Sequence, residues 1–255
     1  MARYFITLTY KGTNYCGWQR QPHAPSVQQT LEEAIQTVFR QSVSLTAAGR
    51  TDTGVHAQFM TAHFDWAEPI DPLVWVSRLN AYLPSDISLF DICPVQAEAH
   101  ARFDALSRTY HYFIHTHKNP FLNDRSWYCS HPLQLAPMQQ AADLLLTHDD
   151  FQCFSKVNTD VTHFKCNVMA ATWQQNDEQL VFEITANRFL RNMVRAIVGT
   201  LYEVGRGKLT PEQFQDILVS KNRSEAGFSA PAQGLFLTQI EYPYPIFNPQ
   251  ISVVL

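Results

Sequence analysis

The chain has 255 residues, of which 45% are apolar and 13% aromatic, and its formal net charge is −4 at pH 7. This length suits one large domain or two small ones, and the apolar content is enough for a buried core, which excludes a disordered chain. No stretch approaches the roughly 18 apolar residues of a membrane span, and the N-terminus does not resemble a secretory signal. We therefore expect a globular cytoplasmic protein.

The first half is predicted to contain two helices among four strands. Ser26 and Gln29 form a candidate capping box for the first helix, and Asp71 followed by Pro72 opens the second. In chain order, the predicted elements are a strand at 4–10, a helix at 27–40, strands at 43–48 and 58–64, a helix at 71–83 and a strand at 87–95.

The second half repeats this order of elements. They are a strand at 108–116, a helix at 137–146, a hairpin of strands at 162–174 and 180–186 about the turn NDEQ, a helix at 189–204, a helix capped by Thr210 and Gln213, and a strand at 235–242. The order β-α-β-β-α-β is that of the ferredoxin-like unit. We predict an α+β fold of two ferredoxin-like halves, residues 1–105 and 106–255, whose largely antiparallel sheets join around a central cleft.

Cysteine and histidine usage gives no support for a metal site. The five cysteines are odd in number and form no CxxC pair, which indicates reduced thiols and neither a disulfide framework nor structural zinc. His111, His115 and His117 lie on one predicted strand without a partner cysteine or acidic triad. We interpret them as solvated or hydrogen-bonded strand residues and predict no metal.

The loop GRTDTGVHA lies between the strands predicted at 43–48 and 58–64. Gly49 and Gly54 flank it, and glycine permits the positive φ that a sharp, exposed loop tip requires. Asp52 is therefore a candidate reactive carboxylate. Taken alone, the spacing favours an aspartate that only hydrogen-bonds its own turn.

The predicted helix at 189–204 carries basic residues opposite an apolar stripe. On a helical wheel, Arg188, Arg191 and Arg195 fall within about 60° of one another, with no acid before Glu203. A solvated helix face usually mixes charges of both signs, whereas an arginine row suits phosphate or carboxylate. The total charge provides no such argument, so we predict a local positive patch on a mildly acidic protein.

Two further segments allow either a structural or a functional interpretation. Tyr110 and Tyr112 share one face of a predicted strand, where tyrosines are usually core residues but where aromatics also stack single-stranded bases. The loop GFSAPAQG precedes the last strand and is by default an ordinary strand entry.

Taken together, these segments resemble the TruA family of tRNA pseudouridine synthases. The resemblance is carried, in the family's order, by GRTDTGVHA, SRTYHY, FQCFSK, NRFLRNMVRAIVG and SAPAQGLFLTQIEYP, and the opening LTYKGTNYCGWQRQP with SVQQTLEEAI is similar as well. It covers residues 3 to 243 and is weakest from Lys118 to Leu135. It implies a homodimer, a basic cleft for tRNA, no cofactor, and conversion of uridine to pseudouridine in the anticodon stem-loop at positions 38 to 40.

The resemblance also implies residue roles. Asp52 matches the family's catalytic aspartate, which attacks either ribose C1′ or uracil C6, and Arg195 matches its ion-pair partner. Tyr110 would stack on the flipped uracil and exchange the proton at C5. Arg50 would hold the flipped nucleotide's phosphate or fill the vacated stack, and Leu235 would close the apolar wall beneath the base. Arg188 and Arg191 are assigned to the RNA surface by spacing alone.

Two other functional classes remain open at this point. A non-catalytic RNA-binding module of the RRM type shares the predicted topology, although the RNP1 pattern is absent from both halves. A hydrolase using Asp52 and His56 would need an activated water and further ligands, and the sequence offers none.

Overall fold

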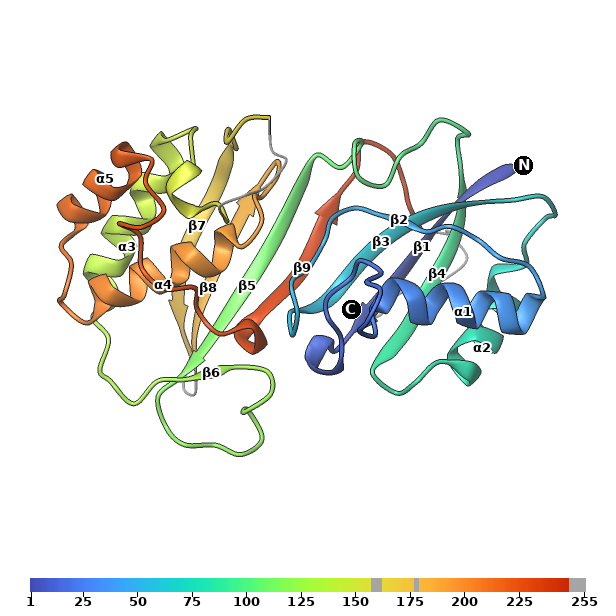
Figure 1. The fold of residues 1–255 in the computed structure, drawn as a ribbon, viewed down its shortest axis with the longest axis horizontal. Helices are drawn as coiled ribbons and strands as arrows, with labels where there is room; N and C mark the ends of the chain where they lie inside the picture. The colour runs from blue at the N-terminus through green and yellow to red at the C-terminus, as the bar shows by residue number, and fades with distance from the viewer. Residues whose placement is uncertain (157–161, 177–178, 248–255) are drawn as a thin grey trace. The chain divides into compact units, whose positions relative to one another are not determined.

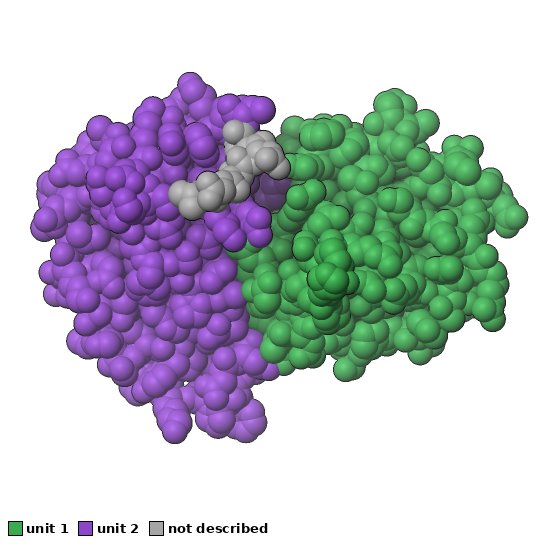
Figure 2. Space-filling model, in the orientation of Figure 1, with its two compact units in different colours: residues 1–106, 237–255 green, residues 107–236 purple. Residues whose placement is uncertain are grey.

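The computed structural model describes residues 1–156, 162–176 and 179–247, and it contains both helices and strands. The chain divides into two compact units, coloured separately in Figure 2: unit 1 is Met1–Leu106 with Leu237–Leu255, and unit 2 is Ser107–Phe236. The last strand of the chain therefore contributes its residues from Leu237 onward to unit 1, although the sequence analysis placed that strand in the second half.

Unit 1 contains a mostly antiparallel set of strands with two helices over it (Figure 1). Strand β1 pairs antiparallel with both β3 and β4, and the short β2 pairs antiparallel with β3. The strand order reads β4-β1-β3, with β9 next to β3. The elements are β1 (Ala2–Tyr10), α1 (Val27–Phe39), β2 (Thr46–Ala47), β3 (His56–Trp66), α2 (Pro72–Tyr82), β4 (Ile87–Val95) and β9 (Leu235–Glu241).

Both faces of β1 are buried, because helices cover one face and the segment after β9 covers the other. Successive side chains of a strand point to opposite faces. Tyr4 stacks on Phe64 of β3, whose ring in turn lies 6.0 Å from that of Trp75 on α2. Phe5 points the other way and meets the ring of Tyr242 edge-on at 5.3 Å.

Unit 2 is built in a similar way. Strand β8 pairs antiparallel with both β5 and β7, and β6 pairs parallel with β5. Helix α3 packs against α4, α5 and β7. The elements are β5 (Ser107–His115), β6 (Trp127–Tyr128), α3 (Leu135–Asp143), η2 (Leu144–Thr147), η3 (Gln152–Phe154), β7 (Val168–Gln175), β8 (Gln179–Ala186), α4 (Met193–Gly205), α5 (Pro211–Ser220) and η4 (Ala232–Gly234).

Local capping signals predict the helix starts in most cases. Asp71 accepts from the N–H groups of Leu73 and Val74 at the start of α2, and Thr210 forms the complete predicted capping box with Gln213 on α5. The Ser26 hydroxyl accepts from Gln29 N–H at α1. The Gln29 side chain instead donates to a carboxylate on its own helix, Glu33, so only the Ser26 half of the predicted capping box is found.

Three predicted elements are shorter in the structure than expected. Helix α4 begins at Met193 and not at Phe189, since Asn192 adopts φ 68°, outside the helical region. Strand β2 keeps only two residues of 43–48, because α1 side chains bond both backbone groups of Leu45. Strand β7 begins at Val168 and not at 162. The turn NDEQ lies partly outside the described residues.

All five cysteines are free thiols, and the strand histidines His111 and His115 have hydrogen-bond partners. His111 lies 2.9 Å from Glu183, and His115 Nδ1 lies 2.9 Å from the Ser126 hydroxyl. Among the described residues, no group of His, Cys, Asp and Glu could hold a metal ion, and no helix is long and apolar enough to cross a membrane.

Candidate active site

The Asp52 loop leads from β2 into β3 in unit 1. Its turn is closed by the N–H of Val55, which donates to the Asp52 carbonyl oxygen at 3.1 Å. Gly54 takes the predicted positive φ, at 79°, whereas Gly49 does not. The Asp52 side chain is partly exposed and Arg50 is exposed. The loop therefore presents one carboxylate and one guanidinium two residues apart.

The backbone of this loop rests against the chain between β1 and α1. A Cβ on Gly17 would lie 2.2 Å from the Thr51 carbonyl oxygen, and one on Gly12 would lie 2.0 Å from that of Val55. Glycine is required at these positions by close backbone approach. The Tyr10 hydroxyl lies 2.8 Å from the Thr51 hydroxyl and ties the loop to the end of β1. The position of Asp52 is thus set by residues some 35 to 40 positions away in the chain.

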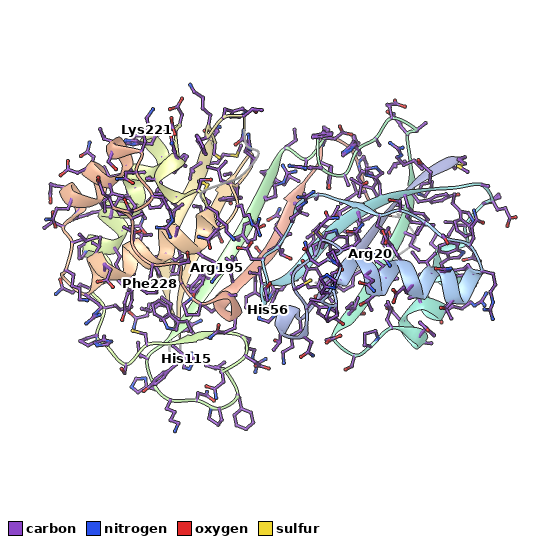
Figure 3. The ribbon with its side chains drawn as sticks, in the orientation of Figure 1. Arg20, His56, His115, Arg195, Lys221 and Phe228 are labelled. Atoms are coloured by element: carbon purple, nitrogen blue, oxygen red, sulfur yellow. The ribbon has the colours of Figure 1, made fainter. Side chains whose placement is uncertain are left out.

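His56 is a structural residue of the same region. It is 1% exposed, and its Nδ1 accepts a hydrogen bond from the N–H of Gly12 at 3.0 Å. The His56 imidazole therefore holds the backbone at Gly12 against the start of β3. Figure 3 labels His56. A hydrolytic pair of Asp52 with a solvent-facing His56 base is therefore not supported.

Arg195 lies in the first turn of α4 in unit 2, where Figure 3 labels it. Its Nε–H donates to the Ala230 carbonyl oxygen at 2.7 Å, and the Ala230 N–H donates to the Arg195 carbonyl oxygen at 2.9 Å. This reciprocal pair fixes both the backbone and the base of the guanidinium. A guanidinium that is bonded through Nε keeps its planar terminal N–H donors, and this geometry suits a carboxylate or a phosphate.

Loop 226–230 supplies this carbonyl, and it is clamped onto α4. The Arg223 guanidinium donates to the Gly227 carbonyl oxygen at 3.0 Å and to the Ser229 hydroxyl at 3.3 Å. Ser229 also accepts from the Asn192 side-chain amide at 2.7 Å. Gly199 completes the contact, since a Cβ there would lie 1.8 Å from the Phe228 carbonyl oxygen. This segment, part of GFSAPAQG, is therefore more than a strand entry, because it positions Arg195.

The two strand tyrosines of β5 have different environments. Tyr112 is fully buried and donates to the Pro231 carbonyl oxygen at 2.7 Å; burial raises the pKa of its phenol, and the charge of Arg195 opposes this effect. Tyr110 is only half-buried and meets the Phe189 ring edge-on at 5.1 Å. Tyr112 is a core residue, and Tyr110 is the accessible aromatic.

The remaining predicted residues also lie in unit 2. Leu235 is buried at the start of β9. Arg188 and Arg191 precede α4, so the prediction that they form a helical row with Arg195 is wrong. The physical reason is the left-handed backbone of Asn192, which interrupts the helical register between them and Arg195. The Arg188 guanidinium lies 3.0 Å from Nε2 of His163, and Arg191 is exposed.

Each unit thus contains some of the predicted site residues. Arg50 and Asp52 lie in unit 1, and the other predicted residues lie in unit 2. Sequence reasoning missed the residues that fix these side chains, although two signals were present: glycines at 12 and 17 ahead of the first helix, and a loop rich in small residues after Arg223. The missed residues are Gly12, Gly17, Asn192, Gly199 and Arg223.

Comparison with known proteins shows to which family the chain belongs. A family model described as tRNA pseudouridine synthase matches residues 6–104 and 141–243, which include every predicted site residue except Tyr110. The chain belongs to the tRNA pseudouridine synthase family. The segment left unmatched, 105–140, contains the stretch where the sequence resemblance is weakest.

Full-length relatives of this family agree with the match. The chain is 51% identical to "tRNA pseudouridine synthase A" of Porphyromonas gingivalis, over 97% of this chain and 100% of that protein. It is 49% identical to the protein of the same name from Parabacteroides distasonis, over 97% and 98%. Identity to the protein of this name from Picosynechococcus is 40%, over 98% and 92%. The chain is therefore an isomerase that converts uridine to pseudouridine in tRNA, and the RRM-type binding module is excluded.

Proposed function

We propose that this synthase modifies uridines 38 to 40 of the tRNA anticodon stem-loop and that Asp52 is the reactive carboxylate. The observation that carries the proposal is the loop itself. Asp52 is partly exposed at a turn whose backbone is fixed against Gly12 and Gly17, within the part of the chain that matches the family. A preorganised, accessible carboxylate is what nucleophilic attack on a flipped nucleotide requires.

The chemistry is an isomerisation and consumes no second substrate. The bond from uracil N1 to ribose C1′ breaks, the uracil turns, and a bond from C5 to C1′ forms. The proton on C5 then leaves, and N1 gains a proton, so the atoms of product and substrate balance. The Asp52 carboxylate begins this sequence at C1′ or at C6. The target nucleotide must leave the base stack first, because its reacting atoms are otherwise inaccessible.

The other predicted residues take supporting roles in this proposal. Arg195, whose fork is anchored at Ala230, pairs with the Asp52 carboxylate and orients it. The half-buried ring of Tyr110 stacks on the flipped uracil, and its hydroxyl exchanges the C5 proton. Arg50 holds the nucleotide's phosphate or fills the vacated stack, and Leu235 forms the apolar wall beneath the base.

RNA binding, fold and assembly follow the family resemblance. We infer that Arg188 and Arg191 contact phosphates, an inference that now rests on their positive charge because the helical row is gone. In this proposal, two ferredoxin-like halves surround an RNA-binding cleft. Residues 1–105 carry the Asp loop, and residues 106–255 carry the Tyr strand and the Arg helix. We also propose that the enzyme is a cytoplasmic homodimer. Sedimentation of the purified protein tests whether it forms a dimer.

The decisive experiment measures tritium release from tRNA labelled at uridine C5. We expect Asp52→Asn to lower turnover by about 10³-fold or more, because the amide is a poor nucleophile, while tRNA affinity stays near that of wild type. Asp216→Asn, which removes an exposed carboxylate on α5, is the matched control and should turn over normally. Release by Asp52→Asn near the wild-type rate would remove Asp52 from the mechanism.

A further inference from the structure

The loop between β4 and β5 presents two exposed side chains that the proposed mechanism does not use. Phe103 is 75% exposed, and its neighbour Arg102 is exposed as well. Both lie in unit 1. We call residues 100–104 the Arg-Phe tip.

The backbone of the Arg-Phe tip is held by side chains at nearly every residue. His100 Nδ1 accepts from the N–H groups of Arg102 and Phe103, at 3.1 and 3.2 Å. His63 Nδ1, from β3, accepts from the Ala101 N–H at 3.1 Å. The Asp104 carboxylate accepts from the His100 N–H at 2.7 Å. The exposed side chains are therefore mounted on a fixed loop.

The segment after β9 braces the same loop from a second side. The Tyr242 hydroxyl donates to the Ala101 carbonyl oxygen at 2.6 Å, and the Tyr244 hydroxyl donates to the Asp104 carboxylate at 2.5 Å. Burial, aided by the charges of His100 and Arg3 and opposed by those of Asp65 and Asp104, lowers the pKa of His63 to about 4. The neutral imidazole keeps its Nδ1 lone pair available for the loop.

Within the tip, the Phe103 ring has an aromatic neighbour and a cationic neighbour and is still 75% exposed. The Phe103 ring lies 4.2 Å from the His100 ring, and the Arg102 guanidinium lies 5.8 Å from the Phe103 centroid. An aromatic face beside a guanidinium is the combination by which proteins bind unpaired nucleotides, with the base on the ring and the cation on the phosphate. A loop already fixed in place loses little conformational freedom on binding.

We propose that the Arg-Phe tip is a tRNA contact, in which Phe103 stacks on an unpaired nucleobase and Arg102 pairs with the adjoining phosphate. Its occupant is RNA and not an apolar peptide, because the exposed ring stands beside a cation and the enzyme's substrate is a polyanion. The proposal rests on tRNA as the substrate and is independent of the role of Asp52. Phe103 is a substrate-positioning residue in this account and takes no part in bond making.

The experiment compares variants of Phe103 in the full chain. Phe103→Ala and Phe103→Leu remove the aromatic face, and Phe103→Trp keeps one. We expect the first two to raise KM for tRNA by about 10-fold or more with kcat within about 2-fold, and Phe103→Trp to restore KM. Leu73→Ala, which removes another exposed apolar side chain of unit 1, is the matched control and should leave KM unchanged.

A salt series separates the two contacts of the tip. In Arg102→Ala, the slope of the logarithm of the tRNA binding constant against the logarithm of salt concentration should fall in magnitude by about one, because one phosphate contact is lost. Phe103→Ala should weaken tRNA binding and leave this slope unchanged. Wild-type KM in Phe103→Ala, or loss of a dimer in that variant by sedimentation, would overturn the proposal. Tritium release by the wild type, abolished in Asp52→Asn, tests the catalytic proposal separately, so the two can fail independently.

Discussion

Two loops fix the candidate active-site side chains, one in each unit, and they are held in different ways. The Asp52 loop lies against backbone, at Gly12 and Gly17, where no side chain fits. Loop 226–230, which bonds Arg195, also meets a backbone closely, at Gly199, and is held in addition by the side chains of Arg223 and Asn192. Both loops therefore depend on a glycine, and the second loop also depends on hydrogen bonds from an arginine and an asparagine. Because Gly17 has a positive φ as well as a close contact, substitution there should be more damaging than substitution at Gly199.

The largest effect is expected from Gly17→Ala. The residue has φ 97°, and its Cβ would lie 2.2 Å from the Thr51 carbonyl oxygen, so the variant combines backbone strain with overlap. We expect the free energy of unfolding to fall by about 2 to 5 kcal/mol, measured by denaturant titration. Gly49→Ala is the control, because a Cβ there meets nothing within 4 Å, and it should stay within about 0.5 kcal/mol. Equal stability of the two variants would contradict the role of backbone approach.

Gly199→Ala tests the tightest backbone approach of the second loop. Its Cβ would lie 1.8 Å from the Phe228 carbonyl oxygen, which should force loop 226–230 away from α4. The higher helix propensity of alanine offsets about 1 kcal/mol of this destabilisation. We therefore expect the free energy of unfolding to fall by about 1 to 3 kcal/mol. Turnover should also fall, because the Ala230 carbonyl would move away from Arg195. A variant with wild-type stability and turnover would show that this contact does not position the arginine.

Arg223→Ala should have a smaller effect, because it removes hydrogen bonds and leaves the packing of the loop intact. We expect a loss of about 1 to 2 kcal/mol in unfolding free energy, together with a lower kcat and a nearly unchanged KM for tRNA. Arg223→Lys should restore little, since one ammonium cannot reach the spread of acceptors at Gly227 and Ser229. Recovery of full kcat by the lysine variant would argue against the clamp.

The smallest effect should come from Arg191→Ala. The side chain is exposed, so stability should change by less than about 0.5 kcal/mol. If Arg191 contacts one phosphate, the slope of log K against log salt for tRNA should fall by about one. Lys165→Ala, which removes a positive charge already paired with Asp149 at 3.0 Å, is the charge-matched control. The same slope in both variants would exclude the phosphate contact.

Much of the fold could be predicted because it depends on neighbouring residues. The strand predicted at 87–95 has those bounds in the structure, and the helix predicted to open at Asp71–Pro72 does so. Asp52 could be singled out in the same way, since its glycine-containing loop is visible in the sequence. Alternation of apolar residues, caps and turn glycines act over at most a few positions, so a single sequence contains the whole signal.

The order of the longer helices and strands, the loop that carries Asp52 and the resemblance to the family could all be read from the amino-acid sequence, whereas the short strand β6 could not. The tertiary structure decided where α4 begins, since Asn192 is held by Ser229, 37 residues further along the chain. It also decided that Gly17 must be glycine, because the Thr51 carbonyl approaches it from a distant segment. Such contacts depend on which backbones meet in space, and neither residue periodicity nor local propensity records that meeting.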